Sequence, residues 1–308
     1  MSRIPCRCLP PPTIDMRSDF KEQAMSRIET MQGKVAVITG GASGIGRGIA
    51  ERMIAQGAQV VIADIDDDRL QATALEIGAT GIRTDVTSSV SVQALADAVL
   101  SLHGKVDILC NNAGIGPMAA ISDLTLNDWK WMLDVNLWGV IHGIHSFLPL
   151  LKSNADGGHI VNTSSMSGMA VTPTLGAYAV AKFGVVALSE VLAQELEIEN
   201  SKVGVSVLCP GPVRTNIGNS SRNRPKDLGE GHLADVDLES TEHFRDVHIP
   251  WVSPAYTGDL VIDAIKRGDL YVLTHPELFD FIYARHQQIA ESVEQALARQ
   301  QSAASAVQ

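Results

Sequence analysis

The sequence predicts a single large α/β domain built on a doubly wound parallel sheet. From Lys34 onward, short and almost continuously apolar segments alternate with longer segments whose apolar residues recur at helical spacing. Apolar strands separated by helices are typical of a parallel sheet that is covered on both faces. The chain has 308 residues, which is enough for one such domain with a substantial core.

The expected strands are short and apolar, and turn residues bound them. They cover residues 35–39, 59–63, 106–110, 159–163, 203–209 and 270–273, with a weaker candidate near 79–84. The expected helices lie between them, at about 45–56, 67–77, 88–103, 126–151, 176–199 and 254–267. A strand followed by a helix, repeated along the chain, is the order of a doubly wound sheet.

Three segments depart from this alternation. Residues 1–30 contain four prolines among scattered charges, and we expect a disordered or mis-annotated extension before a domain at 31–275. Within that domain, residues 213–252 are polar and longer than an ordinary connection, which is typical of a lid over a substrate site. Residues 276–298 predict a last amphipathic helix, within a C-terminal helix and tail at 276–308.

Composition excludes several classes of partner. Lys and Arg total 24 against 35 Asp and Glu, a net charge of −11, so we expect no nucleic-acid partner. No uninterrupted apolar run approaches the ~18 residues of a membrane span, so we expect no membrane association. The four cysteines and nine histidines show neither a metal-ligand spacing nor a disulfide framework. We expect a protein of the reducing cytoplasm that needs no metal.

A glycine-rich turn, T-G-G-A-S-G-I-G at 39–46, directly follows the first expected strand. Gly40, Gly44 and Gly46 let the backbone approach a pyrophosphate, whose charge then lies at the N-terminus of the next helix. Ser43 and Ile45 lie between these glycines. The spacing differs from the usual G-x-G-x-x-G, but its place between a strand and a helix favours a dinucleotide site.

Asp64 ends the second expected strand, eighteen residues after Gly46. A carboxylate at this place accepts hydrogen bonds from the adenosine ribose hydroxyls of a dinucleotide. The 2′-phosphate of NADP would meet like charge there, and the acidic residues 66–68 add to the repulsion. Arg47 argues for NADP instead. We therefore predict NAD as the cofactor, with NADP as the alternative.

Tyr178 and Lys182 are spaced i, i+4 in an expected helix, which places the phenol and the ammonium on one helix face. A free phenol titrates near pH ~10. A cation beside it is expected to lower that pKa toward the range of a general base. Ser165 lies just past an expected strand, where its hydroxyl could hold a substrate oxygen. These three side chains predict acid/base chemistry on an alcohol and its ketone.

Taken together, residues 33–273 resemble the short-chain dehydrogenase/reductase family. The glycine turn resembles the family's cofactor turn, and N-N-A-G at 111–114 follows a strand as it does there. Ser165, Tyr178 and Lys182 match the family's catalytic residues, and Asn136 matches its active-site asparagine. The resemblance implies further cofactor contacts from Asp85, Val86, Asn112, Ala113, Gly114, Pro210, Gly211, Val213 and Thr215.

The resemblance also implies a mechanism. Lys182 would hold the nicotinamide ribose and, together with the charge of the oxidised nicotinamide, lower the pKa of Tyr178. Tyr178 would take the hydroxyl proton of an alcohol while hydride passes to the nicotinamide, and Ser165 would position the substrate oxygen. Asn136 would hold a water that connects Lys182 to solvent. The implied activity is oxidation of a secondary alcohol, reversible as reduction of a ketone.

The residues 216–225, the string H-P-E-L-F at 275–279 and the long last helix resemble a subgroup that acts on bulky aromatic or hydrophobic alcohols. Arg222 and Arg224 are candidates for binding a substrate carboxylate. The family commonly forms homodimers or homotetramers, which the resemblance implies here too. Apolar residues expected to line the substrate pocket are Met118, Met166, Met169, Leu175 and Trp251.

Two other functions use the same fold. An NADP-dependent ketoreductase of acyl-thioester substrates would normally have a basic patch near the adenosine, and the acidic cluster at 64–68 argues against it. A non-catalytic dinucleotide-sensing protein would usually lack the serine, tyrosine or lysine, and all three are present. We therefore expect an active oxidoreductase whose substrate is a small hydrophobic or aromatic alcohol or ketone.

Overall fold

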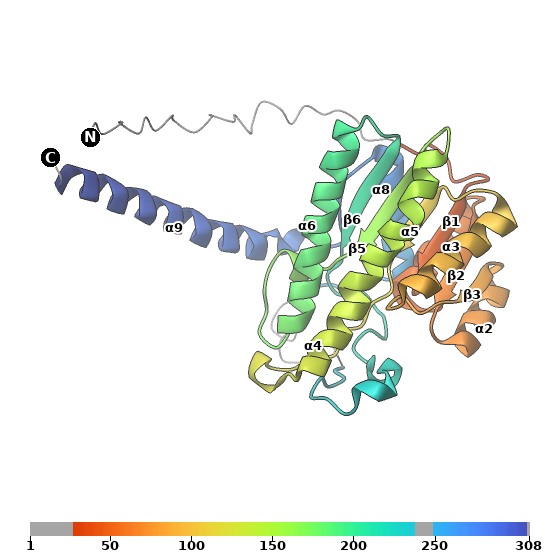
Figure 1. Ribbon diagram of the computed structural model, residues 1–308, viewed down its shortest axis with the longest axis horizontal. Helices are drawn as coiled ribbons and strands as arrows, with labels where there is room; N and C mark the ends of the chain where they lie inside the picture. The colour runs from red at the N-terminus through yellow and green to blue at the C-terminus, as the bar shows by residue number, and fades with distance from the viewer. Residues whose placement is uncertain (1–26, 238–248, 307–308) are drawn as a thin grey trace, which may run out of the picture.

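The computed structural model describes residues 27–237 and 249–306. Within these residues, a parallel sheet of seven strands has the order β3-β2-β1-β4-β5-β6-β7 (Figure 1). This order confirms the doubly wound parallel sheet, including the weak candidate near 79–84. The strands are β1 (Val35–Thr39), β2 (Gln59–Asp64), β3 (Thr80–Arg83), β4 (Ile108–Asn111), β5 (Gly158–Thr163), β6 (Val203–Cys209) and β7 (Tyr271–Leu273).

The order of the strands reverses between β1 and β4. From β1 the chain continues outward to β2 and β3, and the next connection returns it to the other side of β1. The crevice outside the carboxyl ends of the strands at such a point is where doubly wound folds bind ligands. Because β1 ends at Thr39 and β4 ends at Asn111, the glycine turn and residues 112–114 both begin at this crevice.

Helices cover both faces of the sheet, as Figure 1 shows. On one face, Ile49 and Met53 pack with Ile38 and Ile62 of the strands, and the other face has a separate apolar cluster. Each central strand is therefore buried on both sides, which explains its unbroken apolar sequence. The first face carries α1 (Gly44–Ala55), α2 (Asp67–Ile77) and α8 (Pro254–Arg267), and the second carries α3 (Ser89–His103), α5 (Gly139–Ser153) and α6 (Gly176–Ile198).

Local capping explains where several helices begin. Asp66, Ser88 and Ser253 cap α2, α3 and α8, because each side chain accepts a hydrogen bond from a backbone N–H of the first turn. The left-handed Gly78 ends α2. α1 is different, since its N-cap residue Ser43 makes no side-chain capping hydrogen bond. The first turn of α1 therefore keeps backbone N–H groups that can bind a ligand.

The helix expected at 126–151 is not uniform. α4 (Leu126–Leu133) passes into a π-helical turn, η2 (Asp134–Trp138), which continues directly into α5. This wider turn contains the buried Asn136. A π-turn shifts the helical register within a continuous helix, and the hydrophobic spacing alone predicts one regular helix here.

α6 is long and apolar enough, by length and composition, to cross a membrane, and it is the one helix of the described ranges that meets these criteria. In the fold it packs against β6, η2 and the 3-10 turn η3 (Met166–Gly168). Ala181, Val185 and Leu192 are among its buried residues. Its hydropathy is explained by this place in the core of the domain.

The predicted lid is described at 213–237 and 249–252, and the rest of it lies outside the described residues. We use the term lid for residues 213–237. Met118 and Ala234 pair through two backbone hydrogen bonds of 2.9 and 3.0 Å, which join the lid to the segment after β4. Short 3-10 turns in and around the lid are η1 (Ile121–Asp123), η4 (Ser221–Asn223) and η5 (Lys226–Leu228).

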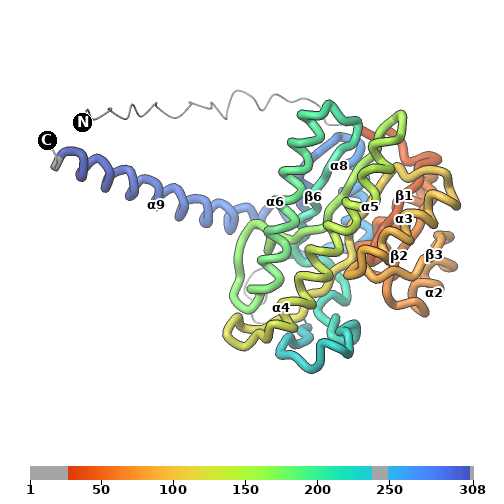
Figure 2. Tube along the Cα trace, viewed as in Figure 1, coloured from red at the N-terminus to blue at the C-terminus, as the bar shows by residue number. Residues whose placement is uncertain are grey.

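The described structure begins within the expected extension and ends in a long C-terminal helix. Ile28 is buried in the same cluster as Met31, so packing extends upstream of residue 31. Residues 1–26, which hold most of the expected extension, lie outside the described residues. After η6 (Pro276–Leu278), the last helix is α9 (Phe279–Ala306), and it projects away from the sheet (Figures 1 and 2).

Candidate active site

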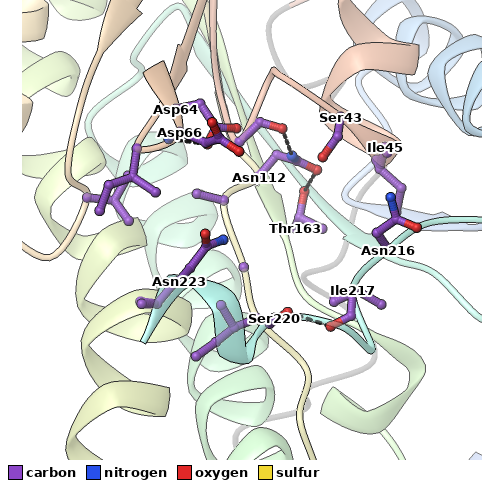
Figure 3. Close-up of a pocket in the computed structure, with 18 of the residues that line it drawn as sticks. Ser43, Ile45, Asp64, Asp66, Asn112, Thr163, Asn216, Ile217, Ser220 and Asn223 are labelled. Atoms are coloured by element: carbon purple, nitrogen blue, oxygen red, sulfur yellow. Dashed lines mark hydrogen bonds between the residues drawn. The ribbon is translucent and has the colours of Figure 1, made fainter. Parts of the chain in front are cut away.

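A cavity opens at the carboxyl ends of the strands, where the order of the sheet reverses. The lid forms one wall: in Figure 3, Ile217, Ser220 and Asn223 lie across the cavity from Asp64 and Asn112. Many residues that the sequence assigns to the site line this cavity. They are Gly40, Ser43, Gly44, Ile45, Asp64, Asp85, Val86, Asn112, Ala113, Gly114, Tyr178, Lys182, Pro210 and Thr215.

Glycines bring the turn after β1 close to its surroundings. Gly40 and Gly44 have φ angles of +65° and +54°, which side-chain-bearing residues rarely adopt. A Cβ on Gly46 would lie 2.3 Å from Gly40 O and 2.5 Å from Asn112 Nδ2, so α1 begins directly against the turn. Because the first turn of α1 has no capping side chain, its N–H groups and helix dipole can bind an anionic group in the cavity.

Asn112 ties this turn to the neighbouring strands. Its backbone N–H donates to Thr39 Oγ1 at 3.0 Å, and its Nδ2 donates to Thr39 O at 3.0 Å and Gly40 O at 3.3 Å. Thr163 Oγ1, at the end of β5, donates to Asn112 Oδ1 at 3.5 Å. One side chain therefore fixes the ends of β1, β4 and β5 relative to one another.

A buried polar chain continues from β4 to α6. Asn111 Nδ2 donates to Asn162 Oδ1 at 2.9 Å, and Asn162 Nδ2 donates to Ser189 Oγ at 3.0 Å. Ser189 in turn donates to Val185 O at 2.7 Å. These bonds hold the helix that carries Tyr178 in a fixed position on the sheet.

Asp64 lies at the edge of the cavity, and backbone groups hold its carboxylate. Oδ2 accepts a hydrogen bond from Ala42 N and Oδ1 accepts one from Asp66 N, both at 3.2 Å. Burial raises the pKa of Asp64, and these backbone hydrogen bonds oppose that shift.

Arg47, the residue that argues for NADP, is engaged elsewhere. Its Nε lies 2.7 Å from Glu51 Oε1 and its Nη2 lies 2.5 Å from Glu76 Oε1. Arg69 does line the cavity, and its Nε lies 3.4 Å from Asp66 Oδ2. Arg47 and Arg69 therefore already face carboxylates of the chain.

Tyr178 and Lys182 lie together on the cavity wall, in the first two turns of α6. Lys182 Nζ is 5.5 Å from the centre of the Tyr178 ring and donates to Thr163 O at 3.0 Å. Burial lowers the pKa of Lys182 to about 8. Burial also raises the pKa of Tyr178 to about 12, although a hydrogen bond with Ser165 acts in the opposite direction.

These shifts correct one expectation. The i, i+4 spacing places the ammonium beside the phenol, as predicted, but the pKa of Tyr178 is raised rather than lowered by the polypeptide alone. The reason is that the desolvation of the phenolate costs more free energy than its hydrogen bond with Ser165 provides.

Ser165 and Asn136 are close to this pair, although neither is among the residues that line the cavity. Ser165 is buried at the N-cap of η3, hydrogen-bonded to Tyr178, and its Oγ accepts a bond from Ser167 N at 3.1 Å. Asn136 Oδ1 accepts from Ile115 N and Nδ2 donates to Ile115 O, both at 2.9 Å. The amide of Asn136 thus fixes the loop after β4, and its expected contact with a water stays a prediction.

Three predicted cofactor residues lie behind the cavity wall rather than on it: Gly46, Gly211 and Val213. A Cβ on Gly211 would lie 2.6 Å from His275 Nδ1, and Val213 forms a β-bridge with Val252. Each of these positions shapes the backbone that carries lining residues. Asp85 lines the cavity and also shapes its backbone, because Asp85 Oδ1 accepts hydrogen bonds from Thr87 N at 2.9 Å and Thr87 Oγ1 at 2.7 Å.

Comparison with known proteins agrees with this geometry. The family model of the short chain dehydrogenases matches residues 34–226, which is more than half of the chain. The chain belongs to the short-chain dehydrogenase/reductase family. Its doubly wound sheet is the Rossmann-like sheet of this family of NAD(P)-dependent oxidoreductases.

Three relatives illustrate the similarity. The CLA biosynthesis dehydrogenase/reductase of Lactiplantibacillus plantarum is 30% identical over 265 residues, which cover 83% of this chain and 93% of that protein. The C alpha-dehydrogenase of a Sphingobium species is 31% identical over 272 residues, covering 86% and 88%. A crystal structure of a short-chain dehydrogenase/reductase from Burkholderia phymatum in complex with NAD is 38% identical with a TM-score of 0.80, covering 86% and 96%.

The cavity of this short-chain dehydrogenase fits a nicotinamide dinucleotide. The uncapped first turn of α1 and the close backbone approach at Gly46 suit a pyrophosphate, and the Asp64 carboxylate at the edge suits ribose hydroxyls. Lys182 adds a buried cation beside the phenol. The rest of the cavity lining includes the apolar residues Ile115, Trp131, Val135 and Ile217.

The sequence analysis missed most of this remaining lining. The apolar residues that were expected to line the substrate pocket are not among the residues that line this cavity. Met166 and Met169 pack against a core cluster that includes Val185, and Met118 pairs with Ala234 of the lid. A tryptophan or isoleucine in an expected helix or loop gives no sequence signal of which way it faces. The cavity-lining residues that were missed include Ile115, Trp131, Val135, Ile217, Ser220, Asn223 and Pro225.

The two arginines that were candidates for binding a substrate carboxylate, Arg222 and Arg224, lie in different surroundings. Arg222 lines the cavity. Arg224 points to the other side of the lid, where its Nη1 lies 2.7 Å from Asp128 Oδ1 and its guanidinium lies 5.3 Å from the Trp131 ring. The carboxylate that Arg224 binds therefore belongs to the chain itself.

Proposed function

We propose that this short-chain dehydrogenase oxidises a hydrophobic or aromatic secondary alcohol with NAD, and reduces the corresponding ketone in the reverse direction. The observation that supports this most directly is the shared cavity. Tyr178 and Lys182 line the same space as the glycine turn and Asp64. An acid/base group thus lies next to a site for a dinucleotide.

The preference for NAD follows from charge. Asp64 is placed to accept hydrogen bonds from ribose hydroxyls, and it would repel a 2′-phosphate. Arg47 is occupied by Glu51 and Glu76, and Arg69 faces Asp66. With Arg47 and Arg69 in these ion pairs, the Asp64 carboxylate favours NAD over NADP.

In the proposed reaction, the side chains of the chain move one proton and hold one oxygen. Ser165 and Tyr178 hold the substrate oxygen between their hydroxyls, and Tyr178 accepts the alcohol proton during oxidation or donates it during reduction. Lys182 stabilises the phenolate form electrostatically. The bound dinucleotide would supply the hydride acceptor and a positive charge near the phenol.

The substrate class rests on the wall of the cavity. Ile115, Trp131, Val135 and Ile217 offer apolar surface there, beside the polar lid residues Asn216, Ser220, Arg222 and Asn223. Such a wall favours a bulky apolar substrate, and the similarity to a C alpha-dehydrogenase is consistent with this class. We also propose a homodimer or homotetramer, as is common in the family.

The test is turnover followed by NADH absorbance, with NAD and NADP against a panel of aromatic and steroid alcohols. Tyr178→Phe should lower kcat by at least about a thousandfold while NADH still binds, because only the proton-transferring hydroxyl is removed. Tyr256→Phe, at an exposed tyrosine outside the cavity, is the matched control. Turnover like the wild type in Tyr178→Phe, or dinucleotide binding without turnover of any panel member, would contradict the proposal.

A further inference from the structure

A buried ion pair fastens the lid to α4. Arg224 of the lid and Asp128 of α4 lie 2.7 Å apart, and their side chains are 12% and 0% exposed. An ion pair removed from water in this way is strongly destabilised when one partner is lost, because the other charge stays buried without compensation. The pair therefore differs from the exposed ion pairs on the surface of the domain.

Asp128 is held as a carboxylate by donors from both elements. Its Oδ2 accepts bonds from Thr125 N at 2.9 Å, Thr125 Oγ1 at 2.8 Å and His232 N at 3.1 Å, and the last of these belongs to the lid. Burial by itself would raise the pKa of Asp128, but these bonds and Arg224 hold it lowered, at about 2. The carboxylate is thus charged throughout the neutral pH range.

The lid wraps closely around the Arg224 side chain. Arg224 Nε donates to Gly229 O at 2.9 Å, which closes a short loop within the lid. A Cβ on Gly231 would lie 2.0 Å from Asp128 Oδ1 and 2.5 Å from Arg224 Nη2. A side chain at position 231 would therefore require the atoms of this ion pair to shift.

The same pair lies directly behind the wall of the active-site cavity. Asn223 and Pro225, the two neighbours of Arg224 in the chain, line the cavity. Trp131, which lies under the guanidinium, also lines it and packs in one apolar cluster with Tyr178 (Figure 3 shows Asn223 facing the cavity). A movement of the lid backbone at Arg224 away from Asp128 would therefore also move these lining residues.

We propose that Arg224 and Asp128 are positioning residues that hold the lid closed over the bound dinucleotide and thereby limit the rate at which it leaves. This inference rests on the proposed function, since it requires a dinucleotide in the cavity. Opening the lid must separate a buried ion pair, so the pair adds to the barrier for release.

The first test measures the release of NADH from the full-length protein by stopped-flow fluorescence. Arg224→Met and Asp128→Asn should each speed release by about tenfold or more, because affinity changes at a contact act mainly on dissociation. Arg224→Lys should fall between them and the wild type, since it keeps the charge but loses the bond to Gly229 O. Lys226→Met, an exposed lysine of the same lid outside the cavity, is the matched control.

The second test needs no dinucleotide. Hydrogen exchange of the free protein should be faster at the amides of 224–232 in Arg224→Met and Asp128→Asn, and unchanged in the sheet. If thermal unfolding shifts but NADH release and lid exchange match those of Lys226→Met, the pair is only structural and the proposal is wrong. If the wild type binds no dinucleotide, the proposed function fails, and lid exchange alone then decides whether the pair holds the lid.

Discussion

Lys182→Met should make the protein more stable while it removes activity. The Lys182 ammonium is 2% exposed and lies in the interior between α6 and the end of β5. A methionine has a similar length and no charge, so it fills the same space without the cost of burying an ion. Active sites commonly carry this kind of locally unfavourable group.

The magnitude follows from the pKa. Burial lowers the pKa of Lys182 from 10.5 to about 8, which corresponds to about 3 kcal/mol of lost stability for the charged form at pH 7. The substitution also removes the hydrogen bond to Thr163 O, which costs about 1 kcal/mol. We therefore expect Lys182→Met to raise the free energy of unfolding by about 2 kcal/mol at pH 7.

The effect has a defined pH dependence. Between pH 8 and 10.5 the unfolded wild type binds a proton at Lys182 that the folded wild type has lost, so wild-type stability rises with pH in this range. Below pH 8 both states are protonated and the full cost is present. The advantage of Lys182→Met should therefore be about 2 kcal/mol at pH 7 and close to zero at pH ~10.

Urea unfolding at pH 7 and pH 10, without added dinucleotide, measures this difference. The matched control is Lys202→Met, because Lys202 also donates to a backbone carbonyl, Ala155 O, at 2.8 Å but is exposed. It should change stability by less than about 0.5 kcal/mol at either pH. A Lys182→Met protein that is less stable than the wild type at pH 7, or equally stabilised at both pH values, would refute the reasoning.

Two further substitutions test the cofactor end of the cavity. Asp64→Ala should reduce the preference for NAD over NADP in kcat/KM by about tenfold or more, because a like charge next to the 2′-phosphate is removed. Asp68→Ala, an exposed neighbour outside the cavity, should change this ratio much less, because its charge is screened by solvent. A wild type that prefers NADP would show that Asp64 is misread. Gly46→Ala should lower stability by about 1–3 kcal/mol and weaken NADH binding, because the added Cβ would lie 2.3 Å from Gly40 O. Helix propensity alone would favour alanine at this position. Gly104→Ala, with φ +72° and open space, should cost about 1 kcal/mol and leave binding intact, and equal effects of the two glycine variants on binding would contradict this reading.

Much of the fold could be predicted because its signals are local. The apolar segments correspond to strands within one or two residues, and the helices expected at 67–77 and 254–267 match α2 and α8. The π-turn around Asn136 was not predicted, because a one-residue change of register inside a helix leaves the apolar pattern almost unchanged. The place of Ile28 in the core was missed for a similar reason, since a single apolar residue in a polar segment carries no periodicity.

The candidate site was predictable where residues lie next to one another in the chain. The glycine turn, Asp64 at the end of its strand and the Tyr178–Lys182 spacing all follow from short-range sequence, and the structure brings them to one cavity. The apolar part of the lining was not predictable, because Trp131 of α4 and Ile217 of the lid are far apart in the sequence and line one cavity only in the folded chain. Their directions depend on contacts between distant segments.

The sequence by itself determined the class of sheet, and it predicted the glycine turn after β1 and the Tyr178–Lys182 pair as site residues, because each depends on spacing within a few residues. The tertiary structure alone decided two electrostatic properties of the site. It showed that burial raises the pKa of Tyr178, and that Arg224 is bound by Asp128 rather than left for a substrate. Both depend on desolvation and on partners far away in the chain, and neither quantity exists until the chain is folded.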